Sequence, residues 1–209
     1  MNGTNPERVA RVARNLIFNP KYLTRYLTTL PLYKKQPIDY ELPWYSFAAI
    51  DILSQIINKN TVIFEYGGGG STVFFAKLAK RVICVESSDA WADKIETVLD
   101  NQNITNVEIL RHPFDFLDKK SFMQSNFLNC VENFEADIYV IDGYEEGIQL
   151  RPYCFERVEK KIKEGNIIVL DDSWRYDSIR NNNKAKMNLI CQSVGPCRYG
   201  VTSTDVFYY

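Results

Sequence analysis

The sequence has no apolar stretch long enough to cross a lipid bilayer. Its apolar runs, such as 47–50 and 167–170, are only a few residues long, whereas a membrane-spanning helix needs about 18 or more apolar residues in succession. A secretory leader is not expected either, because Arg8, Arg11 and Arg14 interrupt any apolar core near the amino terminus. The sequence therefore predicts a protein without a membrane span.

Paired cysteines are also lacking, and histidine is scarce. The five cysteines are odd in number, none of them lies in a Cys-x-x-Cys pair, and His112 is the single histidine. This pattern predicts neither a disulfide framework nor a zinc site. It fits a reducing compartment, so we expect a cytoplasmic protein.

Net charge is low, at −1, but the charges are unevenly distributed. Residues 1–40 contain seven Lys or Arg against two acidic residues, and the acidic excess lies in the remainder of the chain. The spacing of Arg8, Arg11 and Arg14 favours the solvated face of a helix. Aromatic and basic residues do not alternate as a nucleic-acid groove requires. We therefore expect no nucleic-acid partner.

Strand and helix signals alternate through the central part of the chain. Short β-branched runs separated by helical patterns predict a parallel sheet that is covered on both faces. The expected strands are 61–64, 82–85, 107–110, 138–141 and 167–170. The expected helices are 43–58, 72–80, 89–100 and 147–163. With a closing hairpin, the sequence predicts an α/β fold with a doubly wound, seven-stranded, mostly parallel sheet.

The first forty residues are expected to stand apart from this alternation. Pro20, Pro31 and Pro37 break them into one or two short helices. We therefore predict an N-terminal helical segment over 1–42, followed by a main domain over 43–209.

Two further segments have weaker patterns. Aromatic residues mix with polar ones over 113–134, which predicts one imperfect helix and a loop. After the last parallel strand we expect a helix near 183–193 and then the closing hairpin, which ends in the apolar run 206–209.

A glycine-rich turn follows the first expected strand. Gly67 to Gly70 permit positive φ and a close approach of the backbone to a ligand, and the next helix adds unpaired N–H groups at its amino terminus. The pyrophosphate fingerprint Gly-x-Gly-x-x-Gly fails, because Thr72 or Val73 stands at its sixth position. A dinucleotide is therefore not the predicted ligand.

Acidic residues end the first two strands. Glu65 lies just before the glycines, where its charge opposes a pyrophosphate but pairs with the ammonium group of an amino-acid-like ligand. Glu86 ends the second strand, where a carboxylate can accept both hydrogen bonds of a ribose diol. These positions predict a cationic ligand that contains a ribose.

Together, these motifs resemble those of the class I S-adenosylmethionine-dependent methyltransferases. Residues 62–69 and 82–86 resemble the first two motifs of that family, and 137–143 and 165–172 resemble those at the fourth and fifth strands. The resemblance covers roughly 44–209 and implies a methyltransferase with S-adenosylmethionine as its cofactor. It implies that the cofactor is bound by Glu65, Gly67, Gly68, Gly69, Ser71, Thr72, Glu86, Ser87, Trp91 and Asp142.

Three carboxylates are expected to converge at the ends of the fourth and fifth strands. Asp142, Asp171 and Asp172 form an oxygen-rich set of the kind that binds Mg²⁺. The set resembles the divalent-metal site of the catechol-type O-methyltransferases, which implies methylation of a small-molecule or sugar hydroxyl with metal assistance. Asp171 and Asp172 have an alternative role as caps of the segment that follows them.

The catalytic base is less well marked by the resemblance. The catechol-type enzymes have an asparagine at the position of Asp172 and a lysine base after the first aspartate, where this chain has a different sequence. Glu145 and His112 are the candidate bases, together with Asp142 as a catalytic residue. Trp44, together with Tyr45 and Trp174, is a candidate for a lid over the acceptor.

Two other functions remain as alternatives. The triple glycine also resembles that of the aminopropyltransferases, although Ser71 and Gly143 stand where that family has acidic residues. A non-catalytic binding protein on the same fold is the other alternative. Similarity to small-molecule O-methyltransferases favours a small-molecule acceptor, and the sequence leaves the oligomeric state open.

Overall fold

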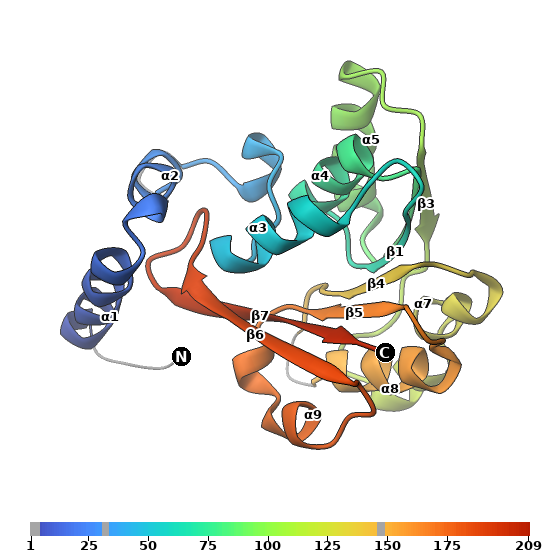
Figure 1. Cartoon of the computed structure of the whole chain (residues 1–209). Helices are drawn as coiled ribbons and strands as arrows, with labels where there is room; N and C mark the ends of the chain where they lie inside the picture. The colour runs from blue at the N-terminus through green and yellow to red at the C-terminus, as the bar shows by residue number, and fades with distance from the viewer. Residues whose placement is uncertain (1–4, 31–33, 146–148) are drawn as a thin grey trace.

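The computed structural model describes residues 5–30, 34–145 and 149–209 (Figure 1). Its strands are β1 (Val62–Tyr66), β2 (Arg81–Glu86), β3 (Val107–Arg111), β4 (Ile138–Ile141), β5 (Ile167–Leu170), β6 (Met187–Val194) and β7 (Val201–Tyr208). Its α-helices are α1 (Asn5–Phe18), α2 (Leu23–Thr28), α3 (Phe47–Ile56), α4 (Gly70–Leu78), α5 (Asp89–Asn101), α6 (Lys119–Gln124), α7 (Asn126–Asn129), α8 (Arg151–Lys161) and α9 (Asp177–Asn181). Short 3₁₀ helices are η1 (Pro20–Tyr22), η3 (Pro37–Tyr40), η4 (Cys130–Asn133) and η5 (Ser173–Arg175).

The described strands form one seven-stranded sheet in the order β3-β2-β1-β4-β5-β7-β6. The first five strands are parallel, whereas β7 runs antiparallel to both β5 and β6. The order reverses between β1 and β4, because the chain first moves outward to β3 and then returns to the other side of β1. In such sheets a ligand binds beyond the carboxyl ends of the strands at this reversal.

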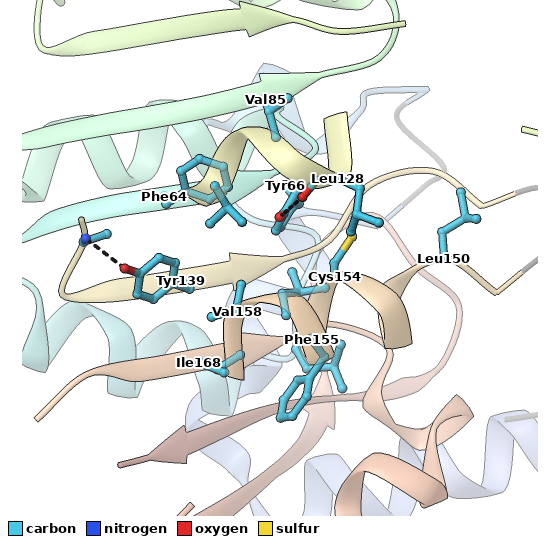
Figure 2. Close-up of a cluster of buried hydrophobic side chains, with 14 of the residues drawn as sticks. Phe64, Tyr66, Val85, Leu128, Tyr139, Leu150, Cys154, Phe155, Val158 and Ile168 are labelled. Atoms are coloured by element: carbon cyan, nitrogen blue, oxygen red, sulfur yellow. Dashed lines mark hydrogen bonds between the residues drawn. The ribbon is translucent and has the colours of Figure 1, made fainter. Parts of the chain in front are cut away.

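Both faces of the sheet are covered by helices. Alternate residues of one strand belong to different clusters, so that Ile63 packs with α3 and α4 while Phe64 packs with α7 and α8. Figure 2 shows the cluster that contains Phe64, to which the strands contribute Tyr66 and Tyr139 and α8 contributes Cys154 and Phe155. A parallel sheet that is buried on both faces gives the nearly continuous apolar strands that the sequence contains.

The N-terminal helices pack against the β6–β7 hairpin. α1 contacts both strands, and in Figure 1 the blue α1 and α2 lie beside the red connection between β6 and β7. Two hydrogen bonds link the segments: the Val194 N–H donates to Asn15 Oδ1 at 3.1 Å, and the Cys197 N–H donates to the Thr29 carbonyl at 2.8 Å. The segment before α3 therefore packs against the β6–β7 edge of the sheet.

The predicted sheet is confirmed, but the helix predicted near 183–193 is wrong. The structure has β6 there, and Met187 through Val194 all pair with β7. Short apolar runs fit both periodicities, and pairing with the neighbouring strand decides the outcome. The predicted helix over 147–163 is α8 from Arg151 onward, and 146–148 lie outside the described residues.

The segment 113–134 also differs from the single imperfect helix that was expected. It contains α6 and α7, which are separated because Ser125 has an extended backbone and caps α7 by accepting a hydrogen bond from the Leu128 N–H at 3.2 Å. In the described part of the chain, every helix falls short of the length and hydropathy needed to cross a membrane.

Candidate functional site

The glycine turn joins β1 to α4 at the reversal of strand order. Gly67 has a φ of +78°, and a Cβ atom there would lie 2.2 Å from the Cα atom of Gly143, which follows β4. A Cβ atom on Gly68 would lie 2.5 Å from Cys84 Sγ, whereas one on Gly69 would meet only the Trp91 ring at 3.7 Å. The first two glycines are thus required by close packing, while a Cβ atom on Gly69 would make only ordinary van der Waals contact with Trp91.

Glu65, at the end of β1, is fully buried beside this turn. Its Oε2 accepts a hydrogen bond from Thr72 Oγ1 at 2.6 Å, and Thr72 is held in turn by the Gly69 N–H at 2.9 Å. Oε1 has no hydrogen-bond partner among the described residues. Burial raises the pKa of Glu65 to about 8, although the nearby hydroxyl groups of Ser71 and Thr72 oppose this shift.

Glu86 ends β2 and faces the same turn. Its Oε2 accepts from the Gly68 N–H at 3.0 Å, and its Oε1 accepts from the N–H groups of Ser87 and Ser88 at 2.7 and 2.9 Å. Because a carboxylate has about four accepting positions, Oε2 retains capacity for a further donor. Trp91 Nε1 donates to the Gly68 carbonyl at 2.7 Å, which fixes the indole against the turn. The structure thus brings the predicted cofactor residues of β1, α4, β2 and α5 together.

Tyr45 contributes a second buried polar atom without a partner. Its side chain is fully buried, and its hydroxyl makes no hydrogen bond to any residue that the structure describes. Burial raises the pKa of Tyr45 well above its usual range, and the nearby carboxylates of Asp142, Glu65 and Asp171 raise it further. Tyr45 is thus a buried residue close to these carboxylates, and the lid role expected for it stays a prediction.

Arg151 occupies the place where a metal ion was expected. This buried side chain donates from one guanidinium nitrogen to Asp142 Oδ1 at 2.8 Å and from another to the Asp171 carbonyl at 2.7 Å, with Asp171 Oδ2 at 3.4 Å. Burial raises the pKa of Asp171 to about 7, with the like charge of Asp142 adding to it and Arg151 opposing. Burial alone would lower the pKa of Arg151, but the two carboxylates raise it.

The third expected metal ligand, Asp172, binds elsewhere. Its Oδ1 accepts from Arg198 at 3.2 Å, from Thr202 Oγ1 at 2.9 Å and from Trp174 Nε1 at 3.2 Å. The described residues contain no group of three or more side chains arranged to hold a metal ion. The described residues therefore give no support to the predicted Mg²⁺ site of Asp142, Asp171 and Asp172, because arginines already pair with these carboxylates.

The candidate bases are not brought to one place. Glu145 Oε1 accepts from the N–H groups of Leu150 and Arg151 at 2.7 Å each, and its Oε2 accepts from the Tyr176 hydroxyl at 2.5 Å. Glu145 thus caps the first turn of α8, and the catalytic role expected for it stays a prediction. His112 follows β3, three strand spacings or about 14 Å from the end of β4.

A cavity of about 470 Å³ opens beyond the end of β5. It lies between α1, the segment before α3 and the β6–β7 connection, and its lining is rich in arginine and tryptophan. The lining residues that bear on its chemistry are Arg8, Arg11, Trp44, Asp172, Trp174 and Arg198. The sequence did not identify this arginine cluster, because its members lie far apart in the chain and only the hairpin brings them together.

Neither a protein-family model nor a curated protein matches the chain. Solved structures match it in fold. An rRNA methylase from Streptococcus thermophilus has a TM-score of 0.54 at 14% identity, over 83% of this chain and 97% of that chain. A precorrin-6y C5,15-methyltransferase from Geobacter metallireducens has a TM-score of 0.56 at 13% identity, over 78% and 87%. A T. thermophilus 16S rRNA N2 G1207 methyltransferase in complex with S-adenosylmethionine and guanosine has a TM-score of 0.57 at 11% identity, over 77% and 42%.

These likenesses establish the Rossmann-like methyltransferase fold and correct one expectation. Two of the three proteins named above are rRNA methylases, so the expectation that nucleic acid is excluded as a partner is wrong. A lack of alternating aromatic and basic residues does not exclude nucleic-acid binding, because a binding surface can be assembled from distant segments of the chain. The three proteins also do not show the expected closeness to catechol-type O-methyltransferases.

Gly67→Ala is expected to destabilise the protein more than Gly165→Ala. Both glycines have positive φ, at +78° and +88°. A Cβ atom on Gly67 would lie 2.2 Å from the Gly143 Cα atom, whereas one on Gly165 would have no described atom within 4 Å. We expect Gly165→Ala to lower the free energy of unfolding by about 1–2 kcal/mol and Gly67→Ala by about 2–5 kcal/mol, measured by urea denaturation. Equal losses would contradict the close approach of the β1 and β4 turns.

Arg151→Met is expected to leave two buried carboxylates without their partner. The predicted loss is about 3–5 kcal/mol in the free energy of unfolding. Arg157→Met, on the same helix, removes a partly exposed pair with Glu132 at 3.6 Å and should cost less than about 1 kcal/mol. Thermal and urea unfolding measure both. Equal losses in the two variants would contradict the role of Arg151 as the buried partner of Asp142 and Asp171.

Proposed function

We propose that this chain is a methyltransferase that binds S-adenosylmethionine at the glycine turn. The observation that supports the proposal is the pair of buried polar atoms without partners, Glu65 Oε1 and the Tyr45 hydroxyl, next to that turn. Buried polar atoms without partners are rare in folded proteins and call for a ligand or water. A ligand that brings an ammonium and a carboxylate group fits this pair.

The residues around the turn fit the other parts of the same cofactor. Glu86 retains an accepting position for a ribose hydroxyl beside Gly68, and the indole of Trp91 offers a flat surface for an adenine ring. Glu65 and Thr72 would hold the amino-acid end, since a buried carboxylate gains most from a positively charged partner.

Methyl transfer asks little of the protein beyond alignment. When bound, S-adenosylmethionine supplies a methyl group on a positively charged sulfur, which keeps the electron pair of the broken bond while the acceptor forms the new bond and loses a proton. The residues of this chain would hold the reacting atoms in line, a contribution that in model reactions is worth several kcal/mol. Arg151 keeps Asp142 fixed at the edge of this site.

The affinity for S-adenosylmethionine should depend on pH through Glu65. In the free protein the pKa of about 8 means that Glu65 holds a proton that the unfolded chain loses near pH 4.5. The contribution of Glu65 to the free energy of unfolding is therefore greatest below about pH 4.5, and it declines as the pH rises toward 8. Pairing with an ammonium requires the ionised form, so binding must release this proton.

Calorimetry of S-adenosylmethionine binding between pH 6 and 7.5 measures this linkage. We expect the affinity to rise with pH, by at most about tenfold per unit, with proton release visible as a dependence of the heat on the buffer. Glu65→Gln should lose the proton release, and Glu164→Gln, at an exposed position, should keep it. Proton release that persists in Glu65→Gln would assign it to another group, and absence of binding by the wild type would refute the proposed function.

A further inference from the structure

The cavity beyond β5 has a strong positive charge for a chain whose net charge is −1. Arg8, Arg11 and Arg198 line it, and Asp172 is the acidic residue in its lining. Asp172 pairs with Arg198 at 3.2 Å, and this pair lowers the pKa of Asp172 although burial opposes it. Because Asp172 neutralises Arg198, the lining keeps a net charge of about +2 from Arg8 and Arg11.

Arg8 and Arg11 are available to a ligand. Neither makes a hydrogen bond or an ion pair with any residue in the described part of the chain, whereas the neighbouring Arg14 lies over the Phe18 ring at 5.9 Å and outside the cavity. Arg8 and Arg11 lie on α1 three residues apart, and residues at this spacing are neighbours on one face of a helix. They form a pair of guanidinium groups suited to one phosphate or two successive phosphates.

The same cavity contains two flat aromatic rings. Trp44 is half-exposed, and the Arg198 guanidinium lies 4.9 Å from its ring centroid while also donating to the Trp44 carbonyl. Trp174 is oriented by its hydrogen bond to Asp172. Exposed tryptophan beside arginine is the combination on which nucleobases stack.

The cavity also lies within reach of the proposed methyl donor. Asp172 directly follows Asp171, which shares Arg151 with Asp142 at the end of the adjacent strand. The end of β5 is two strand spacings, or about 10 Å, from the glycine turn at the end of β1. A ligand held by the wall of this cavity can therefore extend a reactive group toward the edge of the cofactor site.

We propose that the cavity binds the methyl acceptor and that this acceptor is a nucleotide, with its phosphate at Arg8 and Arg11 and its base against Trp44 and Trp174. The proposal rests on the proposed function, because it assigns the acceptor of that reaction. The nucleotide comes either free or as part of an RNA strand, and both present the same phosphate and ring to these residues.

Binding of defined probes tests this assignment. The probes are guanosine and adenosine 5′-monophosphates, the two nucleosides without phosphate, and a twelve-nucleotide single-stranded RNA, each titrated in the presence of S-adenosylhomocysteine. We expect the phosphorylated probes to bind and to quench tryptophan fluorescence, with at least tenfold weaker binding of the nucleosides. Equal affinity for monophosphate and RNA indicates a free nucleotide, and binding that strengthens in the RNA indicates a nucleic-acid substrate.

The double variant Arg8→Gln/Arg11→Gln should weaken binding of the phosphorylated probes at least tenfold. For the RNA, the slope of log affinity against log salt should fall in magnitude by about 1.4, since each phosphate contact contributes about 0.7. Arg14→Gln, on the same helix, is the matched control and should stay within twofold of the wild type. S-adenosylhomocysteine should bind all three proteins alike, which shows that the variants fold.

The outcomes separate this proposal from the proposed function. Binding of S-adenosylhomocysteine without binding of any phosphorylated probe, or equal losses in the double variant and Arg14→Gln, overturns the nucleotide assignment and leaves the methyltransferase proposal intact. Nucleotide binding that depends on Arg8 and Arg11, in a protein that does not bind S-adenosylhomocysteine, supports the cavity as a nucleotide site and refutes its role as a methyl-acceptor site.

Discussion

The pairing of Arg151 with Asp142 and Asp171 is the interaction on which this end of the sheet depends. One buried guanidinium joins the residues that follow β4 and β5, and its other contacts are with the backbone carbonyls of Gly143 and Asp171. Without it, two partly or fully buried carboxylates would repel each other next to a third at Glu65. Glu145 positions α8, and therefore Arg151, by capping the first turn of that helix.

Charge is divided across the carboxyl ends of the strands. Acidic groups gather where β1, β2 and β4 end, and arginines gather beyond β5, with Arg151 and Arg198 between the two halves. A cationic cofactor and an anionic acceptor would each meet charge of the opposite sign. On the proposed assignments, this division would orient the two ligands toward each other.

Much of the fold could be predicted from local sequence patterns. The parallel strands β1, β2, β4 and β5 are short apolar runs that are mostly buried on both faces, and the positive φ of Gly67 is what a run of glycines after a strand predicts. The helix expected at 183–193 failed because a run of eight residues fits two periodicities until its partner strand is known. Glu65 and Glu86 were correctly placed at the turn because a strand end fixes their position.

The site beyond β4 could not be predicted in the same way. Three carboxylates at strand ends are compatible with either a metal ion or a guanidinium, and nothing local marks Arg151, nine residues after Asp142, as the partner. Arg8 and Arg11 were assigned to a solvated helix face, and the cavity that they line together with residues of the β6–β7 connection depends on tertiary packing. The roles of such residues can be recognised only from a structure that places distant segments together.

The most direct test of the account is a crystal structure of the protein grown with S-adenosylhomocysteine. We expect density between the glycine turn and Glu86, with the ligand's amino group at Glu65 Oε1 and its adenine beside Trp91. Ligand density at any other place would contradict the assignment of this turn as the cofactor site. Absence of ligand density at the turn, in crystals grown with excess ligand, would contradict it as well.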